Sequence, residues 1–96
     1  MVKVTIKSST SKGKKMMAVF EYDDGKKKTI HFGQAGASDF TKNKDEKRKS
    51  AYLARHQKNE NWNNYDTAGA LSRWVLWNKK SLSESIRNYK SKFNLS

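Results

Sequence analysis

Hydrophobic and polar residues alternate strictly at the start of the chain. In residues 2–7 (VKVTIK), apolar side chains occupy every second position, and Lys or Thr occupies the others. A period of two is typical of a β-strand with one buried face. Residues 8–15 (SSTSKGKK) are polar and contain a glycine, so they predict a loop after this strand.

Two further apolar runs flank a turn sequence. Residues 16–22 (MMAVFEY) and 27–32 (KKTIHF) are separated by the tetrapeptide DDGK. The Asp24-Gly25 pair favours a two-residue type I′ turn, because both central residues of that turn need a positive φ. A three-residue loop with a Gly bulge is the alternative, and it would shift the strand pairing by one residue.

The two-residue turn decides which side chains share a face of the hairpin. It places three pairs on one apolar face: Glu21 with Lys28, Val19 with Ile30, and Met17 with Phe32. It places six residues on the opposite face: Ala18, Phe20, Tyr22, Lys27, Thr29 and His31. Phe20 and Tyr22 on such a face resemble a stacking platform for single-stranded nucleic acid, unless a helix covers them.

The second half of the chain shows helical spacing and capping signals. Asn43-x-x-Glu46 is a capping box, which predicts a helix that runs to about His56 or Gln57. Three residues lie on or near one stripe of this helix: Tyr52, Leu53 and His56. An Asn-rich connector follows at residues 58–65.

Two more helical patterns complete the chain. Residues 67–77 predict a short helix with four buried side chains: Ala70, Leu71, Trp74 and Val75. Ser81 and Glu84 form a second capping box, and a core-facing stripe follows it at helical spacing: Leu82, Ile86, Tyr89 and Phe93. The whole pattern predicts a single basic α+β domain over residues 1–96, with a three-stranded antiparallel sheet followed by two or three helices.

The net charge of the chain indicates that this small α+β domain binds a partner. There are 21 Lys and Arg against 9 Asp and Glu, so the net charge is +12. A folded domain this basic repels itself, and a polyanionic partner is the usual reason. Nucleic acid is the leading partner, with DNA favoured. An acidic protein surface or an anionic membrane also suits the charge, and a merely well-solvated domain is the alternative without a partner.

Two absences narrow the chemistry. The chain has no cysteine, which excludes disulfides, iron–sulfur clusters and thiol catalysis. It has no apolar run long enough to span a bilayer and no apolar signal segment at its start. We therefore expect no membrane partner, no secretion, and a place inside a cell or a packaged particle.

Cations crowd two segments of the helical half. Seven of them lie in residues 42–58: Lys42, Lys44, Lys47, Arg48, Lys49, Arg55 and Lys58. Only Asp45 and Glu46 offset them there, so pairing within the helix cannot neutralise the segment. Three more cations and an indole lie near the end of the 67–77 helix: Arg73, Trp77, Lys79 and Lys80. These eleven residues are the predicted nucleic-acid contacts, although Trp77 could instead cover the edge of the core.

The loop between the last strand and the first helix has two interpretations. Gly33-x-x-Gly36 has neither the Walker nor the Rossmann spacing. Its glycines permit a tight strand-to-helix turn, which Ser38 and Asp39 can cap. Contact of the loop's backbone N–H groups with a phosphate is the less favoured alternative.

Metal-dependent nuclease chemistry is a weaker alternative for the whole chain. Four residues are the candidate ligands: His31, Asp39, Asp45 and His56. Their spacing matches no motif that fixes a metal site, and no nucleophile–base arrangement accompanies them. We therefore predict no enzymatic activity, no cofactor and no metal.

Three segments resemble a known family. They are HFG (31–33), SDFTKNKDEKRKSAYLARH (38–56) and AGALSRWVLWNKKSLSESI (68–86). Over roughly residues 30–88 the chain is similar to small basic proteins encoded by large double-stranded DNA viruses of algae and protists. The family has no assigned enzymatic activity, and the resemblance implies a viral origin and a role in the virion or in association with the genome. We expect the protein in the virion or in the cytoplasm or nucleus of the host cell.

Charge and resemblance together lead to one expected function. It is non-enzymatic, largely sequence-independent nucleic-acid binding, in viral genome packaging or virion assembly. The alternative is a structural virion protein that bridges acidic capsid surfaces. Copurification with nucleic acid would favour the first, and copurification with a capsid protein the second. Metal-dependent cleavage would favour the nuclease.

Overall fold

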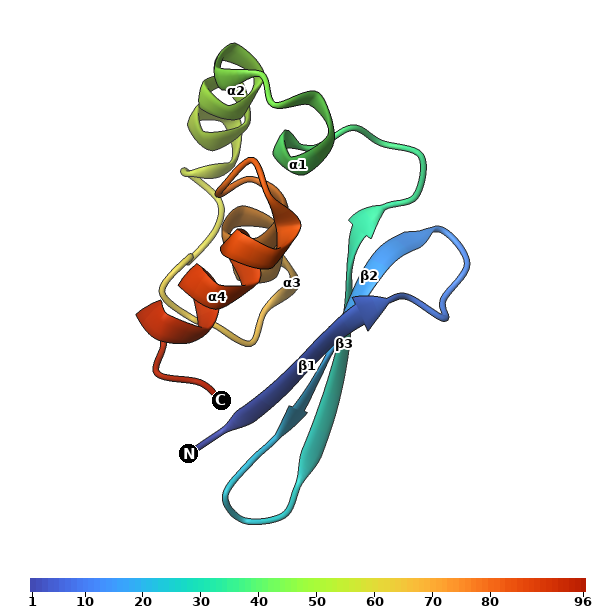
Figure 1. Ribbon diagram of the computed structural model, residues 1–96, viewed down its shortest axis with the longest axis vertical. Helices are drawn as coiled ribbons and strands as arrows, with labels where there is room; N and C mark the ends of the chain where they lie inside the picture. Colours follow the sequence, from blue (N-terminus) through green and yellow to red (C-terminus); the bar gives the residue numbers. More distant parts are fainter.

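The computed structural model describes residues 1–96, and its first half is a meander of three antiparallel strands (Figure 1). The strands are β1 (Lys3–Ser8), β2 (Lys14–Glu21) and β3 (Lys27–Gln34), in the order β1-β2-β3. Five helical segments follow: α1 (Phe40–Asn43), α2 (Glu46–His56), α3 (Ala68–Leu71), the π-helical segment η1 (Ser72–Leu76) and α4 (Leu82–Lys92). The predicted α+β class, with an antiparallel sheet before the helices, is confirmed.

The register of the β2–β3 hairpin differs by one residue from the predicted register. Glu21 lies opposite Lys27, not opposite Lys28. The cause is the turn: Gly25 has a φ of 86°, whereas the residue before it has no positive φ. The Gly25 N–H donates to the Tyr22 carbonyl at 3.0 Å, and the Tyr22 N–H donates to the Lys26 carbonyl at 2.9 Å. The connection is therefore the three-residue loop with a Gly bulge.

The one-residue shift reverses the face on which the β2 side chains lie. Phe20 is fully buried in the core, together with Val4, Ala18 and Phe32. The interpretation of Phe20 as part of an open stacking platform is therefore wrong, because the helices cover this face of the sheet (Figure 1). The alternate positions form the open face, where Met17 is buried and Val19 and His31 are half-buried. Six residues of this face are exposed: Lys3, Thr5, Lys7, Glu21, Lys27 and Thr29.

The core lies between the sheet and the helices α3, η1 and α4. Leu71, Val75 and Tyr89 are all fully buried there. Trp74, which the sequence predicts to be buried, is half-buried and packs against this cluster. Leu82 is 37% exposed, so its predicted core position is wrong. It is the first residue of α4, one turn before the part of the helix that covers the core.

The predicted helix at residues 43–57 begins later than expected. Asp39 caps the single turn of α1 by accepting the Thr41 N–H at 2.9 Å. Lys44 then has a φ of 51° and ends that turn. Asp45, rather than Asn43, caps α2, and its carboxylate accepts the N–H of Lys47 at 3.0 Å. The predicted N-cap of the last helix is confirmed, since the Ser81 hydroxyl accepts the N–H three residues on.

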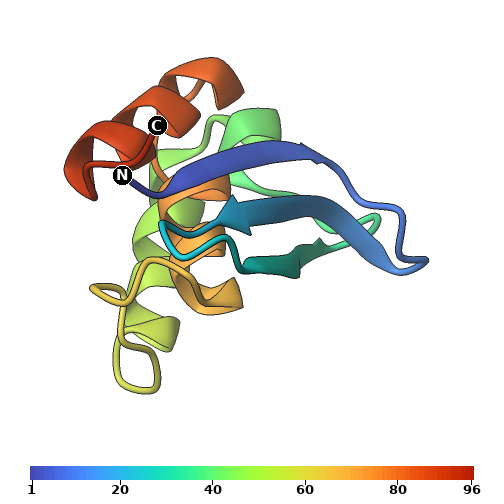
Figure 2. The same ribbon diagram turned by 90° about the horizontal axis from the view of Figure 1, so that it is seen from below.

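The two ends of the described chain meet at the open edge of β1 (Figure 2). The Ser96 N–H donates to the Val2 carbonyl and the Val4 N–H donates to the Ser96 carbonyl, both at 2.9 Å. Leu95 is buried in the core beside this pairing. No helix of the fold is both long and apolar enough to cross a membrane.

Both glycines of the strand-to-helix loop have a positive φ, 78° at Gly33 and 82° at Gly36. Their surroundings differ. A Cβ at Gly33 would lie 2.8 Å from the Leu76 Cδ1 and 3.2 Å from the Lys15 Cβ, whereas a Cβ at Gly36 would meet nothing within 4 Å. Gly36 is therefore needed for its backbone angle alone, and Gly33 for its backbone angle and for space.

The two glycines give a matched pair of substitutions. Gly36→Ala should lower the free energy of unfolding by about 1 kcal/mol, because only backbone strain is added. Gly33→Ala should lower the free energy of unfolding by about 1–3 kcal/mol more than Gly36→Ala does, because the new methyl group crowds Leu76 and Lys15. Urea denaturation of both variants measures the difference. Equal losses would show that η1 does not press against β3 at this point.

Candidate functional site

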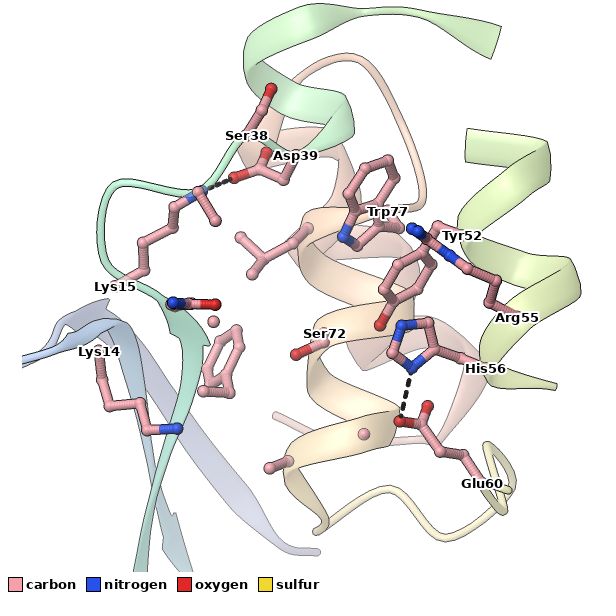
Figure 3. A pocket seen from close by; sticks show the side chains of 17 residues that line it. Lys14, Lys15, Ser38, Asp39, Tyr52, Arg55, His56, Glu60, Ser72 and Trp77 are labelled. Carbon is pink, nitrogen blue, oxygen red and sulfur yellow. Dashed lines mark hydrogen bonds and ion pairs between the residues drawn. The ribbon is translucent and has the colours of Figure 1, made fainter. Parts of the chain in front are cut away.

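The main cavity of the molecule is a cleft of about 430 Å3 between the sheet and α2 (Figure 3). One wall comes from Lys14, Lys15 and the β3 end with its following loop, including Gln34. The other wall comes from α2, and α3 with η1 form the floor (Figure 3). We call this cavity the polar cleft, because only 6 of its 17 lining residues are hydrophobic.

Three stacked rings build the α2 side of the polar cleft. The ring centroids of Tyr52 and Trp77 are 4.5 Å apart with an interplanar angle of 6°. The rings of Tyr52 and His56 are 4.3 Å apart with an angle of 28°. Trp77 therefore covers the edge of the core, the alternative that the sequence left open, and it does so by stacking on Tyr52 and not on Arg73.

The π-helical segment brings Trp77 to the cleft. The Trp77 N–H donates to the Ser72 carbonyl at 3.0 Å, five residues earlier, instead of four as in an α-helix. Both Ser72 and Trp77 line the polar cleft as a result. The sequence predicts one helix over residues 67–77, and α3 with η1 fills residues 68–76 with Thr67 as its N-cap.

The charges of the polar cleft fall into paired and unpaired groups. The Lys15 Nζ lies 2.6 Å from the Asp39 carboxylate, and both side chains are nearly buried. The His56 Nδ1 lies 3.2 Å from the Glu60 carboxylate. Two further cations line the cleft, Lys14 and Arg55, and neither has a carboxylate within 4.0 Å: the ion pairs of the fold involve other residues.

The hydroxyl of Tyr52 stays protonated in this setting. Burial, together with the Glu60 carboxylate, raises the pKa of Tyr52 to about 12. The cations Arg73 and Arg55 and a hydrogen bond with Ser72 oppose that rise. At neutral pH the Tyr52 hydroxyl is therefore a hydrogen-bond donor at the wall of the cleft.

Eight of the ten predicted cationic contacts are exposed side chains. We call this set the basic surface: Lys42, Lys44, Lys47, Arg48, Arg55, Lys58, Lys79 and Lys80. Within it only Arg48 has a carboxylate within 4.0 Å, that of Asp45 at 3.9 Å, and this pair is itself exposed. Acidic side chains therefore leave nearly the whole basic surface without a partner.

Lys49 is not part of the exposed set, contrary to the prediction. Its ammonium donates to the Asn78 carbonyl at 2.7 Å and lies 4.8 Å from the centroid of the Phe40 ring. Burial lowers the pKa of Lys49, and the nearby Arg73 charge lowers it further. The helical spacing to Tyr52 and His56, three and seven residues on, already places Lys49 on the inner face of α2.

Arg73 is also held by the protein itself. Its guanidinium donates to the Trp77 carbonyl at 2.8 Å and lies 4.2 Å above the Trp74 ring and 5.5 Å from that of Trp62. Burial lowers the pKa of Arg73. Because one of its N–H groups and its planar face are both engaged, Arg73 stabilises the indole cluster, and it is half-buried rather than exposed.

The fold brings the two predicted basic segments together. Lys49 of α2 bonds to Asn78, and Tyr52 of α2 stacks on Trp77. These contacts place the loop that carries Lys79 and Lys80 beside α1 and the start of α2 (Figure 1). The basic surface thus combines residues that are far apart in the sequence.

The four candidate metal ligands do not meet. The His31 Nδ1 lies 2.7 Å from the Ser9 hydroxyl, on another part of the sheet from the polar cleft. The remaining three have separate partners: Asp39 pairs with Lys15, Asp45 caps α2, and His56 pairs with Glu60. No three His, Asp or Glu side chains are grouped so that they could hold a metal ion.

Two residues of the cleft were missed by sequence reasoning. Lys14 and Lys15 lie in the polar stretch predicted to be a loop, but they begin β2, where Lys14 pairs with Gln34. No local pattern marks them, because only the long-range pairing of the strands brings them opposite α2.

Comparison with known proteins identifies the family of the chain. Residues 4–56, more than half of the 96, match the Family of unknown function (DUF5754), so the chain belongs to that family. The matched segment contains all of the sheet except Lys3, together with α1, α2 and five members of the basic surface. Neither the curated proteins nor the solved structures contain a match to this chain.

Proposed function

We propose that this protein binds nucleic acid through phosphate contacts, without catalysis and with little dependence on base sequence. The observation that carries the proposal is the basic surface: eight exposed cations, of which one has a carboxylate within 4.0 Å. Phosphate contacts by Lys and Arg release condensed counterions and supply most of the affinity of non-specific binding. They position a protein on a strand but carry no sequence information.

The shape of the basic surface suits an extended polyanion. Lys47 lies on the outer face of α2, opposite the stripe of Tyr52 and His56, and the exposed Arg48 lies at the flank of that stripe. Lys79 and Lys80 continue the surface from the adjacent loop. No aromatic side chain is left fully open on this face for reading single bases, since Trp77 is stacked on Tyr52.

The resemblance to proteins of large double-stranded DNA viruses supports DNA as the natural partner. On that basis we place the binding in viral genome packaging or virion assembly, within the virion or the host cell. Stable copurification with an acidic capsid protein, in the absence of nucleic-acid binding, would instead favour a role in bridging capsid surfaces.

The double variant Lys47→Gln with Arg48→Gln tests the proposal. It removes two charges but keeps good helix formers, so the free energy of unfolding should hardly change. Affinity for a DNA duplex of scrambled sequence should fall, and the slope of log K against log salt should shrink by about 0.9 units for each lost phosphate contact. Fluorescence anisotropy at several salt concentrations measures both quantities.

A matched control removes two charges from the open face of the sheet. Lys3→Gln with Lys7→Gln changes the net charge equally, but both residues lie outside the basic surface. This control should keep most of the wild-type salt slope. If both double variants lose affinity equally, binding follows net charge and the basic surface is not the site. If wild-type protein shows no salt-dependent binding, nucleic acid is not its partner.

A further inference from the structure

We propose that the polar cleft binds a phosphomonoester group, carried either by the end of a nucleic-acid strand or by a free mononucleotide. The inference rests on the proposed nucleic-acid function but concerns a different surface. The basic surface lies on the outer side of α2, whereas the polar cleft lies between α2 and the sheet (Figure 3). Only Arg55 belongs to both.

The size of the cleft suits a small ligand rather than a long polymer. Its volume of about 430 Å3 falls in the range of small-molecule sites, which is about 300–1,000 Å3. Gly69, Ser72 and Leu76 of α3 and η1 line it as a floor, with walls on both sides (Figure 3). A phosphate that fits in a cleft of this size belongs to the end of a strand or to a free nucleotide, and not to the middle of a continuous strand.

The charges of the cleft select a dianion. Asp39 is paired with Lys15, and the Glu60 carboxylate is held by the His56 Nδ1 at 3.2 Å and by the Trp62 indole N–H at 2.7 Å, so neither acid lies within 4.0 Å of Lys14 or Arg55. Lys14 and Arg55 stand on the two opposite walls with no carboxylate partner (Figure 3). A phosphomonoester carries about 1.5–2 negative charges at neutral pH, which matches these two free cations, whereas a phosphodiester carries about one.

Hydroxyl groups between the two cations supply directional hydrogen bonds. In Figure 3 the hydroxyls of Tyr52 and Ser72 and the ammonium of Lys14 all face the same space. The two hydroxyls hydrogen-bond to each other, so the pair has one O–H left to donate to a ligand. Donors held by a stacked ring and a helix are pre-positioned, so they lose little freedom when a phosphate oxygen binds. The three outer oxygens of a monoester can accept several such bonds at once, and charge-assisted bonds of this kind are the strong ones.

Short oligonucleotides that differ only at one end test the inference. Hexanucleotides with a 5′-phosphate, a 3′-phosphate or only hydroxyl ends are titrated against the full chain by calorimetry. We expect a phosphorylated end to bind about tenfold more tightly than a hydroxyl end, which corresponds to one or two charge-assisted hydrogen bonds. A mononucleotide and inorganic phosphate are then added as competitors.

Two variants place the effect in the cleft. Lys14→Gln should abolish the preference for a phosphorylated end, and Lys7→Gln, with the same charge change on the open sheet face, should preserve it. Tyr52→Phe should also weaken the preference, although it keeps the ring that stacks on Trp77. Neither cleft variant should change the salt slope for a long duplex, which reports on the basic surface. Thermal unfolding shows whether each variant is folded.

The possible outcomes separate the two proposals. Equal binding of phosphorylated and hydroxyl ends, with no competition by a mononucleotide, overturns the cleft assignment and leaves the basic surface untouched. A preference that survives Lys14→Gln also overturns it. Competition by a mononucleotide without any end preference identifies the free nucleotide as the source of the phosphate. Loss of salt-dependent duplex binding, with the end preference intact, overturns the proposed function and leaves the cleft assignment in place.

Discussion

Replacing Phe20 with alanine should lower the free energy of unfolding by about 3–5 kcal/mol, a large part of the stability of a domain this small. Phe20 has no exposed surface, and its ring lies 6.2 Å from the Tyr22 ring and 5.8 Å, edge-on, from the Tyr65 ring. Truncation therefore removes a whole buried ring and leaves a cavity between the sheet and the residues that cover it. Chemical denaturation followed by circular dichroism measures the loss.

A control on the other face of the sheet separates packing from binding. Thr29→Ala alters an exposed side chain of β3 and should change the free energy of unfolding by no more than about 0.5 kcal/mol. The informative contrary result is a Phe20→Ala variant with near wild-type stability and lost affinity for single-stranded nucleic acid. That result would mean that the Phe20 ring faces a ligand on the open side of the sheet. The hairpin would then have the register of the two-residue turn.

Asp39→Ala should cost about 3–5 kcal/mol, because it leaves a buried ammonium without its counter-charge. The Asp39 side chain is almost fully buried, and its carboxylate lies 2.6 Å from the Lys15 Nζ. The same carboxylate accepts the Thr41 N–H at 2.9 Å and so caps α1. The substitution thus removes an ion pair and a helix cap together.

Two further variants separate these roles. Asp39→Asn keeps an N-cap acceptor but removes the charge, so any cost that remains belongs to Lys15. Lys15→Met combined with Asp39→Ser removes both charges and keeps a capping hydroxyl, and it should recover much of the lost stability. If Asp39→Ala lowers the free energy of unfolding by less than about 1 kcal/mol, the Lys15 ammonium reaches solvent readily in the variant. The Lys15–Asp39 ion pair would then contribute as little as an exposed ion pair does.

In the sheet, the alternation of apolar residues predicts the buried face of a strand but not the register between strands. The period of two in residues 2–7 places β1 correctly, since Val4 is buried and both Lys3 and Thr5 are exposed. It cannot decide the register of the hairpin, because Asp-Gly is compatible with turns of two and of three residues. The decision depends on which residues take a positive φ, and the wrong choice moved Phe20 to the wrong face.

The candidate site was also predictable only in part. Composition correctly indicated a surplus of cations on the outer side of α2, because so few acids are available to pair with them. A charge count does not say which side of a helix a cation occupies, so it cannot separate Lys49 and Arg73, which both donate to backbone carbonyls, from the exposed cations. The polar cleft was not predictable, because the pairing that brings Lys14 opposite Tyr52 is long-range.

The five-residue turn of η1 has a consequence for how the chain can change in length. Such a turn is an α-helical turn that accommodates one additional residue. Deleting any one residue of 73–76 would restore ordinary turns and rotate Trp77 by about 100° relative to Ser72, away from Tyr52. The loop at 9–13 contains no such turn. Among related chains, insertions and deletions should therefore fall in that loop, while the length of the segment from Thr67 to Trp77 stays constant.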